Sequence, residues 1–578
     1  MKVLAGFSAC ALTLAFAIAS LGAAQTGAPD DDLLGFWGHE AFFGPVVRGE
    51  LELVRAGSRW TIRIAGLEAT REGKGDTLRL ALPTGQGELR ARVPRDAGEI
   101  RAFWIQPPGN LQAYATPIVL RSAGSGVWRG NVTPLDDTFS LYLRISRDTG
   151  GTLRAVFRNP EVGWTGRQPW FRVTKVGETL RLADSTGRER FAQPYDSAGR
   201  RITMDFGQRF ALMPRTPERA IGFYARSPSA PPYVYRAPSP REDGWTVARA
   251  RDAGMDEARL QTMVRSIIAA DPAADTTPRV HSVLVARRGR LVLEEYFRGY
   301  SADRPQDLRS ASKTFNSVMA GAVMLAGVKL DPSTPASRFL TFTGPADPRK
   351  DRITFGHLLT HTTGLACDDN DDKSPGNENT MQEQSEQPDW HRYTLTLPVV
   401  NEPGRVAAYC SGTMSLAGHM IARAAGMWLP EVFDRYVARP MGITRWHMNL
   451  TPSGDGYGGG GMRLLPRDLL KFGEVYLRGG RWNGRRIVSE EWVRQSTAQV
   501  VPVENGDGYG WHRAVLTVNG RKYQEFEANG NGGQFLIVVP ELDLTVVFTA
   551  SDYQRYREWR KFRDVLMPEY IMSAALDK

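Results

Sequence analysis

Alternating apolar and polar residues dominate residues 33–225 and restrict what the first third of the chain can form. Segments such as GELELVR, RWTIRIAG and DTLRLAL place apolar side chains at every second position, and Gly, Asp and Pro separate them. Period-two alternation is typical of strands with one buried face. A spacing of roughly 8–12 residues favours an antiparallel barrel or sandwich. We predict an all-β N-terminal domain, structural or ligand-holding, without a catalytic constellation.

A proline-rich stretch follows, and residues 226–243 are predicted to be a semi-rigid linker. The pattern then changes. MDEARLQTMVRSIIAA has the apolar spacing of a helix, VHSVLVA and RLVLEEYF flank a short turn, and apolar strands return in GQFLIVVPELDLTVVFTAS. Strands from both ends of a region with helices between them predict an α+β domain over 244–578, built on an antiparallel sheet.

Within this domain, Ser310 and Lys313 stand three residues apart where a helix is predicted to begin. Apolar residues recur at helical spacing from Phe315 to Ala326, and Gly327 is predicted to end the helix. Lys313 then lies one turn beyond Ser310 on the same face, within reach of its hydroxyl. The pair fits a nucleophilic serine with its base, but also a capping serine beside a solvated lysine.

Three further stretches are ITFGHLLTHTTGL (353–365), PGRVAAYCSGTMSLAGHMIARAAG (403–426) and GGGGMRLLPRDLLKFGEVYLRGGRWNGRRIVSEEWV (458–493). With the S-x-x-K motif, in this order and spacing, residues from about 244 to 578 resemble the serine β-lactamase and penicillin-binding-protein superfamily. The closer resemblance is to its class C-like branch of esterases, D-aminopeptidases and nylon-oligomer hydrolases. It implies an antiparallel sheet flanked by helices, a helical lobe, and an active site between them.

The resemblance assigns roles to the central residues. Ser310 would be the nucleophile, and Lys313 with Tyr409 would form a proton relay in which either residue could be the formal base. A tyrosine phenolate is disfavoured at neutral pH unless a cation such as Lys313 stabilises it. The Ser310 backbone N–H would form half of an oxyanion hole.

The remaining motif positions depart from the family pattern. Ser411 replaces an asparagine and can still bond Lys313 or a substrate amide. The third motif has one candidate, ANGNGGQ, in which Asn529 and Gly530 stand in and an N–H near Asn531 completes the oxyanion hole. The lysine that helps to hold the carboxylate of β-lactams is missing there, which favours esters or small amides as substrates.

The first residues, MKVLAGFSACALTLAFAIASLGAAQ, predict a signal peptide over 1–24 and a periplasmic or secreted protein without a stable membrane span. Cleavage would remove Cys10 and leave Cys367 and Cys410. In an oxidising compartment these two can pair, or they can remain two buried thiols. The layout implied by the resemblance places both on the helical lobe, which makes a bridge plausible.

Other functions are disfavoured by composition and motifs. The net charge of +10 comes from basic residues without a dense run, which argues against nucleic-acid binding. No zinc motif occurs, and we predict neither a metal nor a cofactor. The acidic stretch 367–379 is predicted to be a solvated loop near the site, with calcium binding as the alternative. The sequence does not determine the oligomeric state.

We therefore predict an exported serine hydrolase that acts on esters or small amides through a Ser310 acyl-enzyme. The alternative from another class is an acyl-accepting sensor or binding protein, in which the ester on Ser310 persists. A β-lactamase or a D-amino-acid peptidase is the alternative enzyme.

Overall fold

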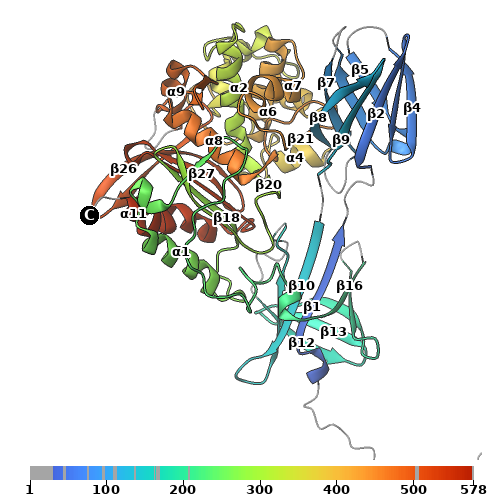
Figure 1. Cartoon of the computed structure of the whole chain (residues 1–578), viewed down its shortest axis with the longest axis vertical. Coiled ribbons are helices and arrows are strands. Elements are labelled where there is room, and N and C mark those ends of the chain that lie inside the picture. The colour runs from blue at the N-terminus through green and yellow to red at the C-terminus, as the bar shows by residue number, and fades with distance from the viewer. Residues whose placement is uncertain are drawn as a thin grey trace, which may run out of the picture.

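The computed structural model of the chain describes residues 30–42, 47–73, 77–93, 98–107, 113–135, 138–161, 163, 170–205, 209–501 and 507–575. The predicted signal peptide, residues 1–24, lies outside the described residues. Figure 1 shows two separate β structures from the first third of the chain and a larger part in which helices surround a sheet. Within the described ranges, no helix has the length and apolar character needed to cross a bilayer.

The first β structure is a closed barrel. Strand β1 pairs with β10 and also, through Trp37 opposite Pro214, with β16. Trp37, Leu143 and Leu212 are buried in its core. Closure leaves the sheet without an unpaired edge. Its strands are β1 (Gly35–Phe42), β10 (Thr138–Arg147), β11 (Leu153–Arg158), β12 (Phe171–Val176), β13 (Thr179–Ala183), β14 (Glu189–Asp196), β15 (Arg201–Asp205) and β16 (Arg209–Arg215).

The second β structure lies between β1 and β10 in the chain and has its own core, in which Leu53, Ile62 and Trp104 are buried. The sequence pattern describes 33–225 as one all-β region and does not reveal this division. The alternation of apolar and polar residues indicates which face of a sheet a side chain occupies, but it does not indicate which strands pair with each other. The strands are β2 (Gly49–Ala56), β3 (Arg59–Ile64), β4 (Leu67–Glu72), β5 (Thr77–Ala81), β6 (Glu88–Arg92), β7 (Glu99–Gln106), β8 (Tyr114–Gly124) and β9 (Val127–Val132).

This second sheet continues into the helix-containing part of the chain. Strand β8 pairs with β21, where Ala115 lies opposite Met448, and β22 and β20 follow. Across the junction, the fully buried His447 shares a hydrogen bond of 2.7 Å with Thr116. Strand β20 leads directly into the segment that carries Ser310, so the N-terminal sheet is joined to the support of the candidate site. The added strands are β20 (Gln306–Asp307), β21 (Trp446–Asn449) and β22 (Arg463–Leu464).

Among the described residues of 244–578, a mostly antiparallel sheet of seven strands forms the centre, and only β17 runs parallel to its neighbour. Strands from both ends of this region meet where β18 pairs with β28. The predicted α+β fold with an antiparallel sheet is therefore confirmed. In spatial order the strands are β17 (Thr246–Val247), β19 (Arg290–Tyr296), β18 (Val280–Arg287), β28 (Leu544–Ala550), β27 (Gln534–Val539), β26 (Arg521–Gly530) and β25 (His512–Val518).

Helices cover both faces of this sheet (Figure 1). On β27, Leu536 and Val538 enter a core shared with α2 and α8, while Phe535 and Ile537 enter a core shared with α1 and η10. Burial on both faces explains the continuous apolar run of this strand. The sheet-covering helices are α1 (Glu257–Ala269), α2 (Thr314–Leu325), α8 (Pro466–Leu477), α10 (Tyr556–Lys561), η10 (Phe562–Met572) and α11 (Ser573–Ala575).

A helical lobe lies between α2 and β21 in the chain. It comprises α3 (Phe355–Leu359), α4 (Glu378–Glu383), α5 (Trp390–Thr396), α6 (Ser411–Ala425), α7 (Leu429–Phe433) and η8 (Asp434–Ala438). Smaller elements are η1 (Asp31–Leu33), η2 (Pro83–Gly85), η3 (Pro217–Arg219), η4 (Ala250–Ala253), η5 (Arg309–Lys313), η6 (Ala336–Arg338), η7 (Pro348–Arg352), η9 (Pro540–Leu542), β23 (Arg481–Trp482), β24 (Arg485–Arg486) and α9 (Glu490–Thr497).

The proline-rich stretch 226–243 packs against the α+β domain. Tyr233 and Tyr235 are buried in the same core as α1. The Tyr235 hydroxyl donates to the carbonyl of Val292 (2.7 Å) and accepts from the amide of Ala250 (2.8 Å). Proline content indicates a stiff, extended backbone but not its contacts, and in this structure the stretch adds side chains to the core of the domain.

Candidate active site

Ser310 and Lys313 lie in one tight turn, η5, which runs directly into α2. The Lys313 Nζ donates to Ser310 Oγ at 3.0 Å and also to the carbonyl of Gly459. Lys313 is only 4% exposed, which excludes the reading of a solvated lysine. A serine hydroxyl within hydrogen-bond distance of a buried amine is the geometry that nucleophilic catalysis requires.

The residue before Ser310 has an unusual backbone conformation. Arg309 has a φ of +47°, in the left-handed region that non-glycine residues rarely occupy. Asp307 holds it there, because its carboxylate accepts from the Arg309 amide at 2.9 Å and pairs with the guanidinium at 3.1 Å. Backbone strain of this kind is typical of functional sites, and here it sets the entry of the chain into the Ser310 turn.

The charge of Lys313 reflects competing influences. Burial lowers the pKa of Lys313, but Tyr409 and the carboxylates of Glu378 and Asp369 together raise it above the ordinary value for lysine. The ammonium form is therefore favoured at neutral pH in the free protein. In that form Lys313 is a hydrogen-bond donor to Ser310.

Tyr409 lies beside Lys313, with 4.8 Å between its ring centroid and Nζ. The ring of His361 lies 4.8 Å from that of Tyr409, and His361 Nδ1 accepts from the Cys410 amide at 3.1 Å. Burial and the charge of Lys313 lower the pKa of His361 to about 3, so that the imidazole stays neutral. His361 thus holds the backbone of the Tyr409 segment without adding charge to the site.

Ser411 does not bond Lys313 in this structure. Its side chain is fully buried, and its hydroxyl and its amide both donate to Asp369 Oδ2, each at 2.7 Å. Of the two bonds that the motif position allows for this hydroxyl, the one to Lys313 is therefore not made. The physical reason is Asp369, a half-buried acceptor that competes for the hydroxyl.

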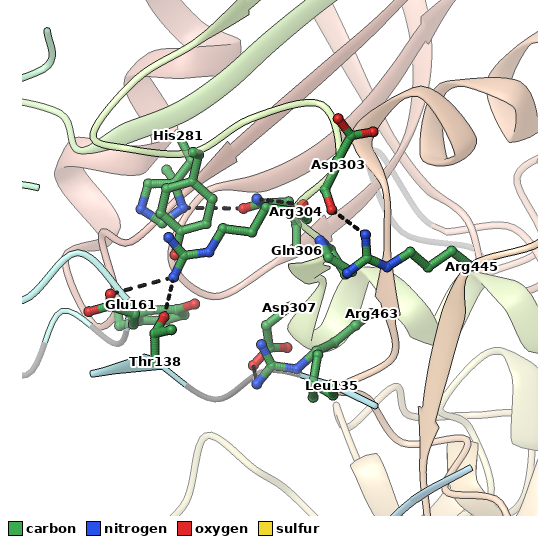
Figure 2. A pocket seen from close by; sticks show the side chains of 14 residues that line it. Leu135, Thr138, Glu161, His281, Asp303, Arg304, Gln306, Asp307, Arg445 and Arg463 are labelled. Atoms are coloured by element: carbon green, nitrogen blue, oxygen red, sulfur yellow. Dashed lines mark hydrogen bonds and ion pairs between the residues drawn. The ribbon is translucent and has the colours of Figure 1, made fainter. Parts of the chain in front are cut away.

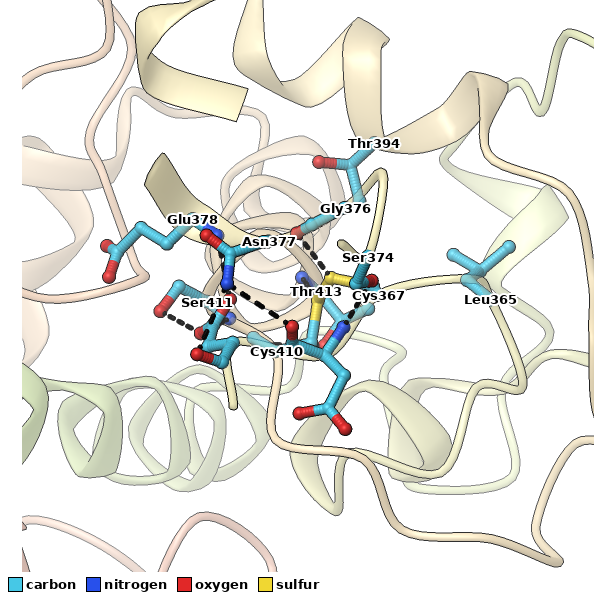
Figure 3. The surroundings of a disulfide bond; sticks show 12 residues. Leu365, Cys367, Ser374, Gly376, Asn377, Glu378, Thr394, Cys410, Ser411 and Thr413 are labelled. Atoms are coloured by element: carbon cyan, nitrogen blue, oxygen red, sulfur yellow. Dashed lines mark hydrogen bonds between the residues drawn. A yellow bond between two sulfur atoms is a disulfide. The ribbon is translucent and has the colours of Figure 1, made fainter. Parts of the chain in front are cut away.

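A disulfide joins Cys367 to Cys410 with a Cα–Cα distance of 5.6 Å. Figure 3 shows it beside Ser411 and the beginning of α4. The bridge connects the acidic loop to the residue between Tyr409 and Ser411. It therefore closes one side of the candidate site covalently.

Asp369 is the site residue that sequence reasoning missed. Besides Ser411, its carboxylate accepts from the amide of Glu378 at 2.9 Å, and its own amide donates to the Tyr409 carbonyl at 2.7 Å. Burial raises the pKa of Asp369, and Lys313 opposes this increase. The sequence signal that could have indicated Asp369 is its position two residues after Cys367, which forms a disulfide with Cys410.

The rest of the acidic loop behaves differently from Asp369. The carboxylates of Asp368 and Asp371 accept from the amides of Asn370 and Lys373, each at 2.9 Å. These bonds close local turns. The predicted solvated loop therefore describes this part of the stretch, while Asp369 and Glu378 face Lys313.

Of the three third-motif candidates, Gly530 approaches the Ser310 turn with its backbone, while the side chains of Asn529 and Asn531 bond other groups. At Gly530, an added Cβ would lie 2.4 Å from the Leu308 carbonyl oxygen and 3.1 Å from the Ser310 nitrogen. Only glycine allows β26 to approach the Ser310 turn this closely. The Asn529 side chain donates to Glu527 at 2.8 Å, and the Asn531 side chain accepts from the Gln554 amide at 2.9 Å. The structure thus brings Gly530 to Ser310 but engages both asparagines otherwise.

A polar cavity of about 320 Å³ lies behind the Ser310 turn, between the N-terminal β region and the α+β domain (Figure 2). Arg304 bonds Thr138 at 2.8 Å and pairs with Glu161 at 3.4 Å. Asp307 also lines it, opposite Arg463 at 3.8 Å. Of the described residues that line this cavity, none belongs to the Ser310, Lys313 and Tyr409 group. We regard it as part of the domain junction.

Comparisons with known proteins identify the family of this chain. Residues 264–564 match the family model named Beta-lactamase, which confirms the resemblance seen in the motifs. The 6-aminohexanoate-dimer hydrolase of Paenarthrobacter ureafaciens is 25% identical over 231 residues, which are 36% of this chain and 55% of that hydrolase. The chain thus spans about half the length of that relative.

Solved structures of this class are similar at lower identity. A family VIII carboxylesterase is 17% identical, with a TM-score of 0.40 over 52% of this chain and 96% of the esterase. An octameric penicillin-binding protein homologue from Pyrococcus abyssi is 18% identical, with a TM-score of 0.42 over 53% of this chain and 77% of the homologue.

Proposed function

The chain belongs to the β-lactamase family of serine hydrolases, and on that premise we propose that it is an exported hydrolase of esters or small amides. Ser310 forms the acyl-enzyme, and Lys313 with Tyr409 moves the protons. The observation that carries this proposal is the 3.0 Å contact between the buried Lys313 Nζ and Ser310 Oγ, with the Tyr409 ring beside the same nitrogen.

The first half of the reaction transfers the acyl group to the protein. Ser310 Oγ bonds the substrate carbonyl carbon while its proton passes to the relay, and the oxyanion is stabilised by the Ser310 N–H and a donor from the strand side near Asn531. When the tetrahedral intermediate collapses, the relay gives the proton to the leaving alcohol or amine. In the second half, water attacks the ester, its proton enters the relay, and Ser310 recovers a proton on release of the acid.

The raised pKa of Lys313 bears on which relay residue is the base. A lysine held as ammonium cannot accept the serine proton, but it stabilises negative charge on a neighbouring oxygen. This supports the assignment in which Tyr409 accepts the proton and Lys313 remains charged. The two assignments differ in the sign of the pH dependence, because a charged Lys313 requires activity to fall as Lys313 loses its proton, whereas a basic Lys313 requires it to rise.

The substrate class follows from what the strand side lacks. ANGNGGQ has no lysine to pair with a β-lactam carboxylate. Asp369 and Glu378 lie close enough to Lys313 to raise its pKa, and they disfavour an anionic group near it. The amide-hydrolysing relative supports small amides beside esters. Export is supported by the signal-like first residues and by the Cys367–Cys410 bridge, because disulfides persist in oxidising compartments.

The proposal is tested by assaying the purified protein and its Ser310→Ala variant on p-nitrophenyl acetate, a linear ω-amino-acid oligomer, a D-amino-acid amide and nitrocefin. We expect turnover of ester or small amide, loss of it in the variant, and little hydrolysis of nitrocefin. Ser301→Ala, at an exposed serine, is the matched control. Undiminished turnover by Ser310→Ala contradicts the proposal. A single burst followed by a stable acyl-protein supports the sensor function instead, and efficient nitrocefin hydrolysis supports a β-lactamase.

A further inference from the structure

Two histidines of the helical lobe and an aspartate of the loop after β21 converge at one point. His391 lies on α5, His419 on α6, and Asp455 in the loop after β21. One ligand atom from each lies within 4.8 Å of the other two. Both His391 Nδ1 and His419 Nδ1 are 3.9 Å from Asp455 Oδ2. Since the three residues are far apart in the sequence, no short motif indicates this group.

His391 has an unused buried nitrogen that points into the group. Its side chain is 3% exposed, and its Nε2 lies 2.9 Å from Ser415 Oγ. No described residue offers its Nδ1 a hydrogen-bond partner. Burial lowers the pKa of His391 to about 3, so the imidazole is neutral at physiological pH. Buried polar nitrogens normally have a partner, and an Nε2–H donated to Ser415 leaves the Nδ1 lone pair facing Asp455.

We propose that His391 Nδ1, His419 Nδ1 and Asp455 Oδ2 bind a divalent transition metal of the zinc class. Two imidazoles and a carboxylate form a donor set that suits zinc. Ligands at zinc distances in a tetrahedron are about 3.4 Å apart. The two His–Asp separations of 3.9 Å must therefore contract slightly, and the two histidine ligand atoms, which lie within 4.8 Å of each other, must also move together on binding. Ser415 supplies the outer hydrogen bond that orients a metal-binding histidine.

The exposure of the group provides access for a metal and a place for its remaining ligand. The side chains of His419 and Asp455 are 22% and 43% exposed. A water molecule can complete the coordination from that side. Arg423 and Arg90 add positive charge near the group and Asp389 adds negative charge.

The metal would stabilise the support of the catalytic relay without touching it. Trp390, next to His391, packs against Tyr457 with 5.3 Å between ring centroids, and the Tyr457 hydroxyl donates to Glu378 at 2.5 Å. Farther along this loop, the carbonyl of Gly459 accepts from Lys313. A metal joining α5, α6 and Asp455 fixes the start of this loop, so binding should raise the melting temperature.

The test is zinc binding to the chelator-treated full-length protein, measured by calorimetry and by metal analysis after gel filtration. We expect a single equivalent of zinc and a higher melting temperature with zinc than with chelator. Cobalt substitution should give the visible absorption of a site with nitrogen and oxygen ligands. His419→Ala and Asp455→Asn remove partly exposed ligands and should abolish all three signals.

The matched control is His39→Ala, which removes a histidine of the barrel and should leave zinc binding unchanged. Failure of the wild-type protein to retain zinc, or equal retention by His419→Ala and by the wild type, overturns the proposal. Because the readouts are metal content and melting temperature, they do not depend on the hydrolase activity.

Discussion

The two sides of the candidate site are built by different means. The helical side, with Ser310, Lys313 and Tyr409, places polar side chains together and holds them with a disulfide and the half-buried Asp369. The strand side contributes the close backbone approach of Gly530, while its neighbouring asparagines bond other groups. The helical side therefore contributes reactive side chains, whereas the strand side contributes the position of its backbone. Substitutions should therefore act differently on each.

The largest effect is expected on the helical side. Lys313→Ala and Tyr409→Phe should each lower kcat by about 10²–10⁴-fold, with a much smaller change in KM, because they act on proton transfer in the transition state. Steady-state kinetics on p-nitrophenyl acetate measures this. Lys329→Ala, at an exposed lysine after α2, should behave like the wild type. An effect confined to KM would show that these residues only bind substrate.

On the strand side, backbone position should matter more than side-chain chemistry. Gly530→Ala adds a Cβ against the Leu308 carbonyl and the Ser310 amide, so the strand must shift and the oxyanion donors separate. Losing one such donor lowers kcat by roughly 10²–10³-fold. Asn529→Ala should leave kcat nearly unchanged, because that side chain bonds Glu527. A larger loss of kcat in Asn529→Ala than in Gly530→Ala would contradict this description of the strand side.

The covalent support of the helical side can be removed separately. The Cys367→Ala/Cys410→Ala double variant should lose about 4 kcal/mol of unfolding free energy in the chain-entropy description of a bridge spanning 43 residues, less any strain. Its kcat should also fall, because Tyr409 adjoins Cys410 and loses part of its support. The decrease should be smaller than in Lys313→Ala or Tyr409→Phe, because the relay side chains themselves remain. Chemical denaturation measures the first quantity. Reductant should weaken the wild type but not the double variant, and alkylation of both cysteines without reductant would refute the bridge.

The smallest effect concerns pH. Glu378 helps to raise the pKa of Lys313, so Glu378→Gln should lower the pKa of Lys313. The limb of the plot of kcat/KM against pH that reports Lys313 should then move to lower pH, by less than about one unit. Glu383→Gln, at the other end of α4, is the matched control. A shift to higher pH would contradict the charge assignment. If Tyr409 is the base and Lys313 stays charged, activity should fall as pH rises through this limb. If Lys313 is the base, activity should rise.

How much could be predicted from the sequence depends on how local each feature is. The β18–β19 hairpin, the α2 helix and the Ser310–Lys313 spacing are encoded within short segments, and the structure has them as predicted. The pairing of β8 with β21 joins Ala115 to Met448, which no local pattern can indicate. The same holds for the split of the N-terminal region into a barrel and a joined sheet.

At the candidate site, the limit of prediction is again distance in the chain. The motif position allows Ser411 to bond Lys313 or a substrate amide, and in the structure its hydroxyl bonds Asp369 from a different loop. Polar residues in an acidic stretch look alike in sequence. Their hydrogen-bond partners in the fold separate Asp369, which accepts from Ser411, from Asp368 and Asp371, which close local turns.

The central claim is that Ser310 carries the acyl group, and trapping that group tests it most directly. The protein is mixed with p-nitrophenyl acetate, quenched in acid within the first turnovers, digested and analysed by mass spectrometry. We expect an acetyl adduct on the peptide that contains Ser310, accumulation of that adduct in a variant slowed in deacylation, and no adduct in Ser310→Ala. Turnover without an adduct, or an adduct on another residue that persists in Ser310→Ala, would contradict it.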